Sequence, residues 1–337
     1  MGRKGEHISK TKYGLSEYLA FFVCIIVSIV MVVMLFNPKD VPNSHSSSDD
    51  GYTVIDLNSK DENAGSVDTS VEESSEDGVE YITIKVDADS VYIGDLILVN
   101  NTHLYAFKDK TEIVEVYEYK NKKYKIGSGE ECLFEKTILA ANDFLGDFND
   151  ISGLTNVTMV SGYITEEAQN AKYESYIKSV TPEEAQKWGV KAGASDHHTG
   201  LSFNLTLYPS GGKIGEGEYS WLTENAYRYG FILRYPEDKS EITSVRDNNH
   251  FRYVGIPHAE YMYVNNLTLE EYIEQLGKTT YKTPLDIKSG NKEYAVYYFP
   301  ADSSSSETEI KIPEGFEYSV SGNNIDGFIV TVNMTTK

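Results

Sequence analysis

Cysteine is almost absent from this chain: only Cys24 and Cys132 occur among its 337 residues. Cys24 lies inside an apolar run, so we expect no disulfide bond between the two. A chain with so little cysteine is not a disulfide scaffold, and its stability must come from packing. With 40% apolar residues, the chain can build one sizeable core and a small second unit.

Positive charge is also scarce. The chain has 30 Lys and Arg against 52 Asp and Glu, which gives a formal net charge of −22. A nucleic-acid-binding protein carries a basic patch or stripe, and this sequence has none, so we expect no nucleic-acid partner. The acidic balance favours solubility and does not itself identify a partner.

Long apolar runs are limited to one, between Tyr18 and Phe36, which contains no charged residue. As a helix it would span roughly 28 Å, close to the hydrocarbon thickness of a bilayer. A cleavable signal peptide is the alternative, but the run is long for one and no small-residue cleavage site follows. Basic residues precede the run. The sequence therefore predicts a single transmembrane helix at 18–36, a cytoplasmic N-terminus at 1–17, and a main domain outside the cell membrane.

Three further segments differ in composition. Residues 37–80 are rich in serine and acidic side chains and hold few large apolar residues, so we expect a flexible stalk. Residues 81–277 contain strand-like alternation over 81–100 and 156–164 and several helical patterns. The predicted helices cover 136–148, 165–180, 182–188, 220–230 and 269–276, two of them after capping boxes at Thr181 and Thr268.

The last segment, residues 278–337, has the alternation of strands around a serine-rich loop. We expect a small β-rich extension. The sequence leaves three roles open for this extension: a lid over a site, a docking surface, or a cap on an exposed sheet edge.

Histidines supply the candidate chemistry. Residues 195–204 read as a loop running into a strand, where alternating side chains would let only one of His197 and His198 face a site. His250 precedes a second strand. Two histidines, one oxygen ligand and an open position make a catalytic zinc arrangement, in which a nearby carboxylate activates water. From spacing alone, these histidines are equally well read as core or surface residues.

Four motifs occur in order: SGYITEEAQ (161–169), SDHHTGLSFN (195–204), WLTENAYRYGFILRYP (221–236) and DNNHFRYVG (247–255). Together they resemble the VanY-type zinc D-alanyl-D-alanine carboxypeptidases of bacterial cell-wall metabolism, and the resemblance covers roughly residues 80–278. It implies an α+β fold, with helices packed on an antiparallel sheet and a zinc cleft open on one face. The transmembrane helix would precede this fold and the β-rich extension would follow it.

By this resemblance, His197 and His250 are zinc ligands. Asn204 occupies the place of the ligand aspartate, and Asp247 that of the catalytic glutamate. The positions that contact substrate are Ser195, Tyr163, Ile164 and Gln169. Ile164 stands where the family has an arginine. His198 and His258 have no family role, and we expect them to be structural or solvent-facing.

The departures from the family pattern fall at the reacting centre. An amide oxygen is a neutral and weaker ligand than a carboxylate. Asp247 is one methylene shorter than glutamate, and a misplacement of about 1 Å can lower a rate about 100-fold. Loss of a cation aimed at the developing charge typically costs a further 100- to 1000-fold. Such effects need not multiply.

The sequence therefore favours a membrane-anchored extracellular protein of peptidoglycan metabolism that is attenuated or catalytically dead and acts by binding. Its partner would be a peptidoglycan stem peptide or another envelope protein. The alternative is an active zinc metallopeptidase that removes terminal D-Ala from stem peptides. In one form of that alternative, Asp247 replaces Asn204 as a zinc ligand, and a water or Asp196 is the base.

Overall fold

The computed structural model describes residues 70–72, 79–109, 111–209, 211–245 and 247–335. The predicted transmembrane helix at 18–36 and most of the predicted stalk lie outside these residues. Within the described ranges, no helix is long and apolar enough to cross a membrane.

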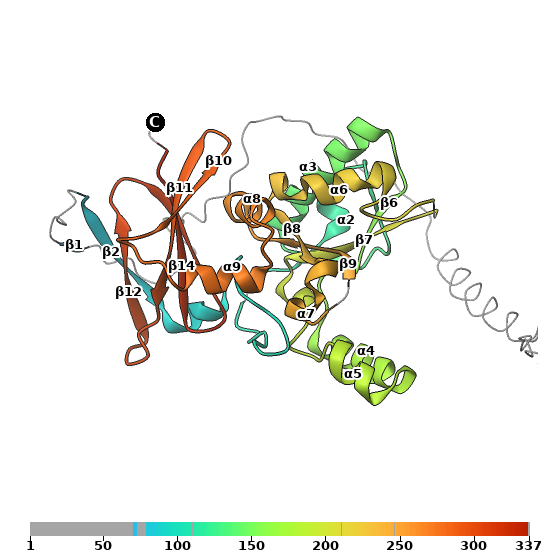
Figure 1. The fold of residues 1–337 in the computed structure, drawn as a ribbon, viewed down its shortest axis with the longest axis horizontal. Helices are drawn as coiled ribbons and strands as arrows, with labels where there is room; N and C mark the ends of the chain where they lie inside the picture. The colour runs from blue at the N-terminus through green and yellow to red at the C-terminus, as the bar shows by residue number, and fades with distance from the viewer. Residues whose placement is uncertain (1–69, 73–78, 110, 210, 246, 336–337) are drawn as a thin grey trace, which may run out of the picture. The chain divides into compact units, whose positions relative to one another are not determined.

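A five-stranded sheet in the order β4-β6-β7-β9-β8 includes parts of three of the four motifs. Figure 1 labels its strands β6, β7, β8 and β9. Its pairs are antiparallel except for β4 with β6. This sheet with its packed helices confirms the expected α+β fold. The strands are β4 (Lys125–Ile126), β6 (Val157–Val160), β7 (Ser202–Leu207), β8 (Phe231–Tyr235) and β9 (Asp247–Tyr253).

An aromatic core joins this sheet to α3 (Glu135–Ser152), which extends the predicted helix at both ends. Phe144 of α3 lies with its ring centroid 5.7 Å from those of both Phe231 and Phe251 on the sheet. Beside α3 lie α2 (Val116–Tyr119), the pair β3 (Val114–Glu115) and β5 (Cys132–Leu133), α6 (Ser220–Asn225) and the short helix η4 (Ala226–Tyr229). Burial of these rings provides most of the local stabilisation.

Two helices follow β6 and form a hairpin, α4 (Glu166–Ser179) and α5 (Pro182–Trp188). Their starts agree with the sequence prediction. Thr165 caps α4, and Thr181 with Glu184 forms the predicted capping box of α5.

A second core cluster holds α8 (Ile256–Val264) and α9 (Leu269–Leu276) between β8 and the C-terminal strands. The predicted capping box of Thr268 and Glu271 starts α9. Between the central strands and α8 lie η5 (Glu237–Lys239) and α7 (Ser240–Thr243).

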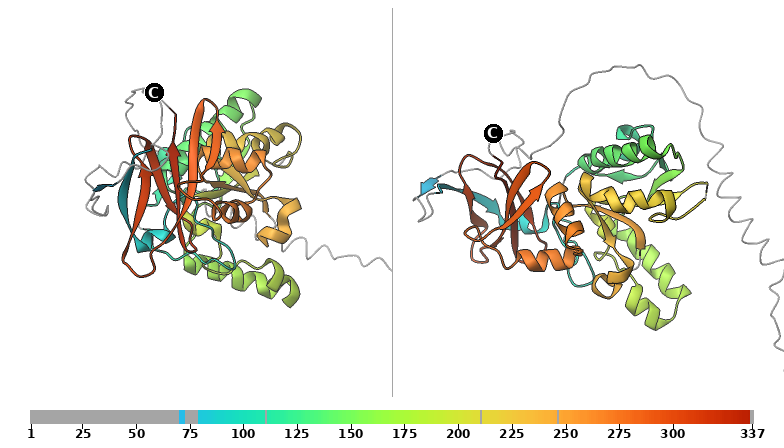
Figure 2. Two further views of the ribbon diagram at one scale, coloured as in Figure 1. Left: turned by 60° about the vertical axis from the view of Figure 1, so that its left-hand side comes forward. Right: turned by 45° about the horizontal axis from the view of Figure 1, so that its top comes forward.

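The C-terminal segment, together with β1 and β2 from before the central domain, forms two sheets around their own core, with strand orders β1-β2-β12 and β10-β11-β14-β13. Figure 2 shows β2 alongside the C-terminal strands. The strands are β1 (Ser70–Glu72), β2 (Tyr81–Asp87), β10 (Leu285–Ser289), β11 (Lys292–Pro300), β12 (Glu307–Pro313), β13 (Glu317–Gly322) and β14 (Gly327–Asn333). Hereafter this unit is called the sandwich.

Strand β2 was grouped with 81–277 by sequence, yet it pairs with β12 from Glu307↔Asp87 to Pro313↔Tyr81. The strand predicted over 81–100 was too long: η1 (Ala88–Tyr92) follows β2, and residues 93–100 belong to no sheet. Gly94 lies at φ +127, where a Cβ would come 2.3 Å from the Ser321 hydroxyl. Glycine therefore allows the chain to pass close to Ser321 after η1.

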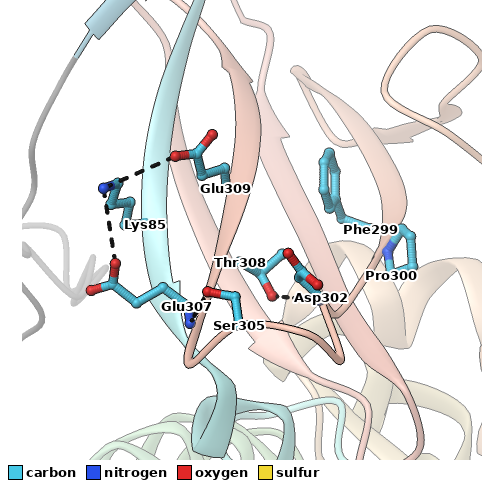
Figure 3. Close-up of a pocket in the computed structure, with 8 residues that line it drawn as sticks. All are labelled: Lys85, Phe299, Pro300, Asp302, Ser305, Glu307, Thr308 and Glu309. Carbon is cyan, nitrogen blue, oxygen red and sulfur yellow. Dashed lines mark hydrogen bonds and ion pairs between the residues drawn. The ribbon is translucent and has the colours of Figure 1, made fainter.

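A pocket of about 340 Å³ opens on the sandwich surface (Figure 3). Lys85 lies between Glu307 and Glu309 there, with N–O separations of 3.9 and 4.0 Å. Exposed pairs of this kind contribute about 0–1 kcal/mol. The pocket includes no residue of the four sequence motifs.

Candidate functional site

His197 lies in η2 (Asp196–Thr199), a single turn of 3₁₀-helix that Gly200 ends in the left-handed region at φ +68. Consecutive side chains on such a turn point about 120° apart, so the alternation expected for a strand does not apply to His197 and His198. A Cβ on Gly200 would lie 2.5 Å from the Ile113 side chain. Glycine is therefore required where the turn enters β7.

Strand pairing brings the predicted ligands together. Asn204 on β7 lies directly opposite His250 on β9. The ring of His197 lies with its centroid 4.5 Å from that of His250. His197 Nδ1 and Asn204 Oδ1 are both buried with no hydrogen-bond partner. An unsatisfied buried polar atom costs about 1–3 kcal/mol, so a ligand that reached either atom would be stabilising.

Asp247 is engaged by the residue that replaces the ligand aspartate. Asn204 Nδ2 donates a 2.6 Å hydrogen bond to Asp247 Oδ2. The other carboxylate oxygen accepts a hydrogen bond from the backbone N–H of Asn249 at 3.1 Å. The first bond also sets the amide orientation, because it turns Asn204 Oδ1 away from Asp247. Asp247 as the base stays a prediction, and each of its oxygens already accepts one hydrogen bond.

Asp196 is fully buried behind His250. One oxygen lies 3.2 Å from His250 Nε2, and the other accepts a hydrogen bond from Arg252. Arg234 Nε lies 3.7 Å from Asp196 Oδ1. Burial opposes ionisation of the Asp196 carboxyl, but Arg252, His250 and Arg234 together hold its pKa well below its usual range. A carboxylate held on both oxygens in this way orients His250 and is poorly placed to act as a base.

His197 is a neutral imidazole at pH 7. Burial lowers the pKa of His197 well below its usual range, and neighbouring His250 lowers it further. Neutral imidazole is the form that binds metal.

His198 and His258 are structural, as expected. His198 Nε2 accepts from the Gly193 amide at 3.1 Å, so Nδ1 carries the proton that is donated to the Ile164 carbonyl at 2.7 Å. His258 lies 2.8 Å from the Tyr272 hydroxyl and 3.1 Å from that of Thr331.

The predicted substrate positions surround η2. Ile164 is 9% exposed, and its amide donates to the His197 carbonyl at 3.4 Å, which puts an apolar side chain where the resemblance expects a cation. Ser195 is buried at the start of η2, and Tyr163 is half-buried. Gln169 is also buried, and its Nε2 donates to the Val190 carbonyl at 2.7 Å. This bond gives Gln169 a structural role in holding α4.

The donor set is two imidazoles and one amide oxygen. Within the described part of the chain, no three His, Cys, Asp or Glu residues are grouped to hold a metal. Two atoms of this set, His197 Nδ1 and Asn204 Oδ1, have no hydrogen-bond partner, but the set lacks the carboxylate of a zinc site with two His and one Asp or Glu. The set therefore carries one negative charge fewer than a site with two His and one carboxylate, and we expect it to hold zinc more weakly.

Sequence reasoning missed Arg234 and Arg252. Both are 0% exposed, Arg234 in the apolar strand β8 and Arg252 in the polar strand β9. A buried arginine must be paired, so Arg234 within an apolar strand was an available signal, whereas the polar sequence around Arg252 gave none.

Known proteins resemble this chain over the same region. Residues 135–256 match the family model described as VanY: D-alanyl-D-alanine carboxypeptidase. A D-alanyl-D-alanine carboxypeptidase of Enterococcus faecium is 32% identical over 253 residues, which are 72% of this chain and 77% of that protein.

Two solved structures add detail. The vancomycin resistance D,D-dipeptidase VanXYg, in complex with a D-Ala-D-Ala phosphinate analog, is 30% identical with a TM-score of 0.65, over 75% of this chain and 99% of that one. A mutant of the D,D-pentapeptidase VanY from a VanB-type resistance cassette, solved with Zn(II), is 32% identical with a TM-score of 0.44, over 53% of this chain and 98% of that one.

Proposed function

Because this chain belongs to the VanY family of D-alanyl-D-alanine carboxypeptidases, we propose that it binds peptidoglycan stem peptides and has lost most or all of the hydrolytic activity. The hydrogen bond from Asn204 to Asp247 carries this proposal. It joins the two positions that the resemblance assigns to a metal ligand and a base, and it satisfies the carboxylate without a metal.

Each departure weakens hydrolysis for a separate reason. A base must reach the attacking water, and Asp247 is both shorter than glutamate and held by Asn204 and the Asn249 amide. Ile164 offers no positive charge to an oxyanion. Effects of this kind cost about 100-fold or more each, although they need not multiply.

Anchoring at the cell membrane belongs to the same proposal. The uncharged run at 18–36 is long enough to span a bilayer, and the basic residues before it favour a cytoplasmic N-terminus. The domain would then lie outside the cell, within reach of the wall.

The test uses the full-length chain. We expect retention on purified peptidoglycan without release of D-Ala from a peptide ending in D-Ala-D-Ala, with zinc added or withheld. Release of D-Ala that disappears in a His197→Ala/His250→Ala variant would refute the loss of hydrolysis. Failure to be retained would refute the binding role.

A second candidate is an active zinc D,D-carboxypeptidase. The unsatisfied His197 Nδ1 and Asn204 Oδ1 favour it, because both atoms are buried beside His250. His197, His250 and Asn204 would hold the zinc, which supplies Lewis acidity to a scissile carbonyl. Elemental analysis near one zinc per chain, lost in the double histidine variant, would favour this candidate.

A further inference from the structure

An extended segment, residues 95–99, runs between the sandwich and the candidate site; it is called the strap below. Its alternate residues bond in opposite directions, as along an extended strand. Toward the sandwich, the Leu96 amide donates to Ser321 Oγ at 2.9 Å and the Leu98 amide to the Asn323 carbonyl at 3.1 Å. Asn324 Nδ2 returns a bond to the Leu98 carbonyl at 2.8 Å.

The opposite edge of the strap faces the two buried arginines. Arg252 donates to the carbonyls of Asp95 and Ile97 at 3.1 and 3.2 Å. Arg234 donates to the carbonyl of Val99 at 3.3 Å. Backbone oxygens of the strap therefore satisfy guanidinium hydrogens that have no access to water.

Both arginines face Asp196 and, through it, His250. Arg252 bonds one oxygen of Asp196, and His250 Nε2 lies 3.2 Å from the other. Arg234 is held in place from behind by Glu270, with two bonds of 2.9 and 2.7 Å. A displaced strap would leave Arg252 with unpaired buried hydrogens and let it shift, which would shift Asp196 and His250 in turn.

The sandwich side of this connection is itself tightly built. Ser321 is 9% exposed and Asn324 is 6% exposed, and the Asn324 backbone lies in the left-handed region at φ +61. Neither residue belongs to the sequence motifs of the site.

We propose that the sandwich is part of the site's scaffold, and that Ser321 and Asn324 are positioning residues that fix the His250 ring through the strap, Arg252 and Asp196. This gives the C-terminal extension a role other than a lid or a docking surface. The proposal rests on the proposed function only in taking His250 as a site residue.

The test follows the His250 ring directly. Long-range ¹H–¹⁵N NMR spectra of the imidazole rings are recorded for ¹⁵N-histidine-labelled full-length wild type and variants. The His250 signals are assigned with a His250→Gln variant. We expect the His250 ring signals to shift or double in Ser321→Ala, which leaves the Leu96 amide without its acceptor.

Two further variants complete the design. Ser319→Ala is the matched control, because Ser319 lies on the same strand and is exposed. Asn324→Gly removes the bond to the strap yet keeps a residue that tolerates φ +61, so it serves if Ser321→Ala does not fold. A His250 shift in either variant but not in the control supports the proposal.

Unchanged His250 ring signals in both Ser321→Ala and Asn324→Gly, each folded, would overturn the proposal. The measurement involves neither turnover nor peptide binding. A negative result would therefore not contradict the proposed function, and the His250 signals can be interpreted even if the proposed function is wrong.

Discussion

Replacing Asn204 by aspartate tests whether the neutral amide of Asn204 stabilises the Asp247 carboxylate. In Asn204→Asp, the 2.6 Å hydrogen bond to Asp247 becomes a contact between two carboxylates. Two like charges at that separation repel by about 6 kcal/mol at an effective dielectric constant of 20. Asp247 is half-buried and can turn toward solvent, so we expect a net loss of about 2–4 kcal/mol in the free energy of unfolding at pH 7.

The pH dependence has a definite sign. Repulsion raises the pKa of the carboxylate pair in the folded variant, so the destabilisation is present above that raised pKa. It is lost as the pH falls and the pair takes up a proton. Zinc should reverse the loss at pH 7, by about 2.7 kcal/mol at a concentration 100 times its dissociation constant.

The assay is urea unfolding of the full-length chain at pH 7 and pH 4, with a chelator or with zinc. Asn248→Asp is the matched control, because Asn248 also donates to a carboxylate, that of Glu237, but does so exposed to solvent. If Asn204→Asp unfolds like the wild type with chelator at pH 7 and zinc adds nothing, the conclusion that the Asn204 amide stabilises the Asp247 carboxylate in the absence of metal is refuted.

Three further predictions concern the surroundings of the site. Arg252→Ala should lower the free energy of unfolding by about 3–5 kcal/mol, because it leaves Asp196 buried with its principal ion pair broken; urea unfolding measures this, and a loss below 1 kcal/mol would contradict it. His258, whose pKa burial lowers to about 4, is neutral when folded, so stability should fall as the pH drops from about 6.5 toward 4. The fall should be smaller in His258→Gln, and equal pH profiles would exclude His258 as the cause. Gly200→Ala should lower the thermal unfolding midpoint because φ at this position is +68, which residues with a Cβ rarely adopt, whereas Gly211→Ala, with no atom within 4 Å, should change it little.

Local signals in the sequence were sufficient for many elements. The capping boxes at Thr181 and Thr268 mark the starts of α5 and α9, because cap hydrogen bonds depend on residues three positions apart. The pairing of β2 with β12 could not be predicted in this way, since its partners are far apart in the chain. The strand predicted over 81–100 ends at Asp87, and the backbone groups of residues 95–99 bond to the sandwich loop and two arginines instead of to a neighbouring strand.

The candidate site, too, was predictable only in the part that local motifs and strand register determine. The motif resemblance identified His197, His250, Asn204 and Asp247, and strand register brings Asn204 opposite His250. The bond between Asn204 and Asp247 depends on side-chain orientation across two strands, which spacing does not encode. The arginine network depends in addition on the strap, which no motif includes.

The central claim, that hydrolysis is attenuated by changes at three positions, is tested most directly by restoring them. D-Ala release from a D-Ala-D-Ala peptide is measured, with zinc present, for the full-length chain and for its Asn204→Asp/Asp247→Glu/Ile164→Arg variant. We expect the restored variant to be at least about 100-fold faster. Equal rates, with release by the wild-type chain abolished in His197→Ala/His250→Ala, would contradict the account.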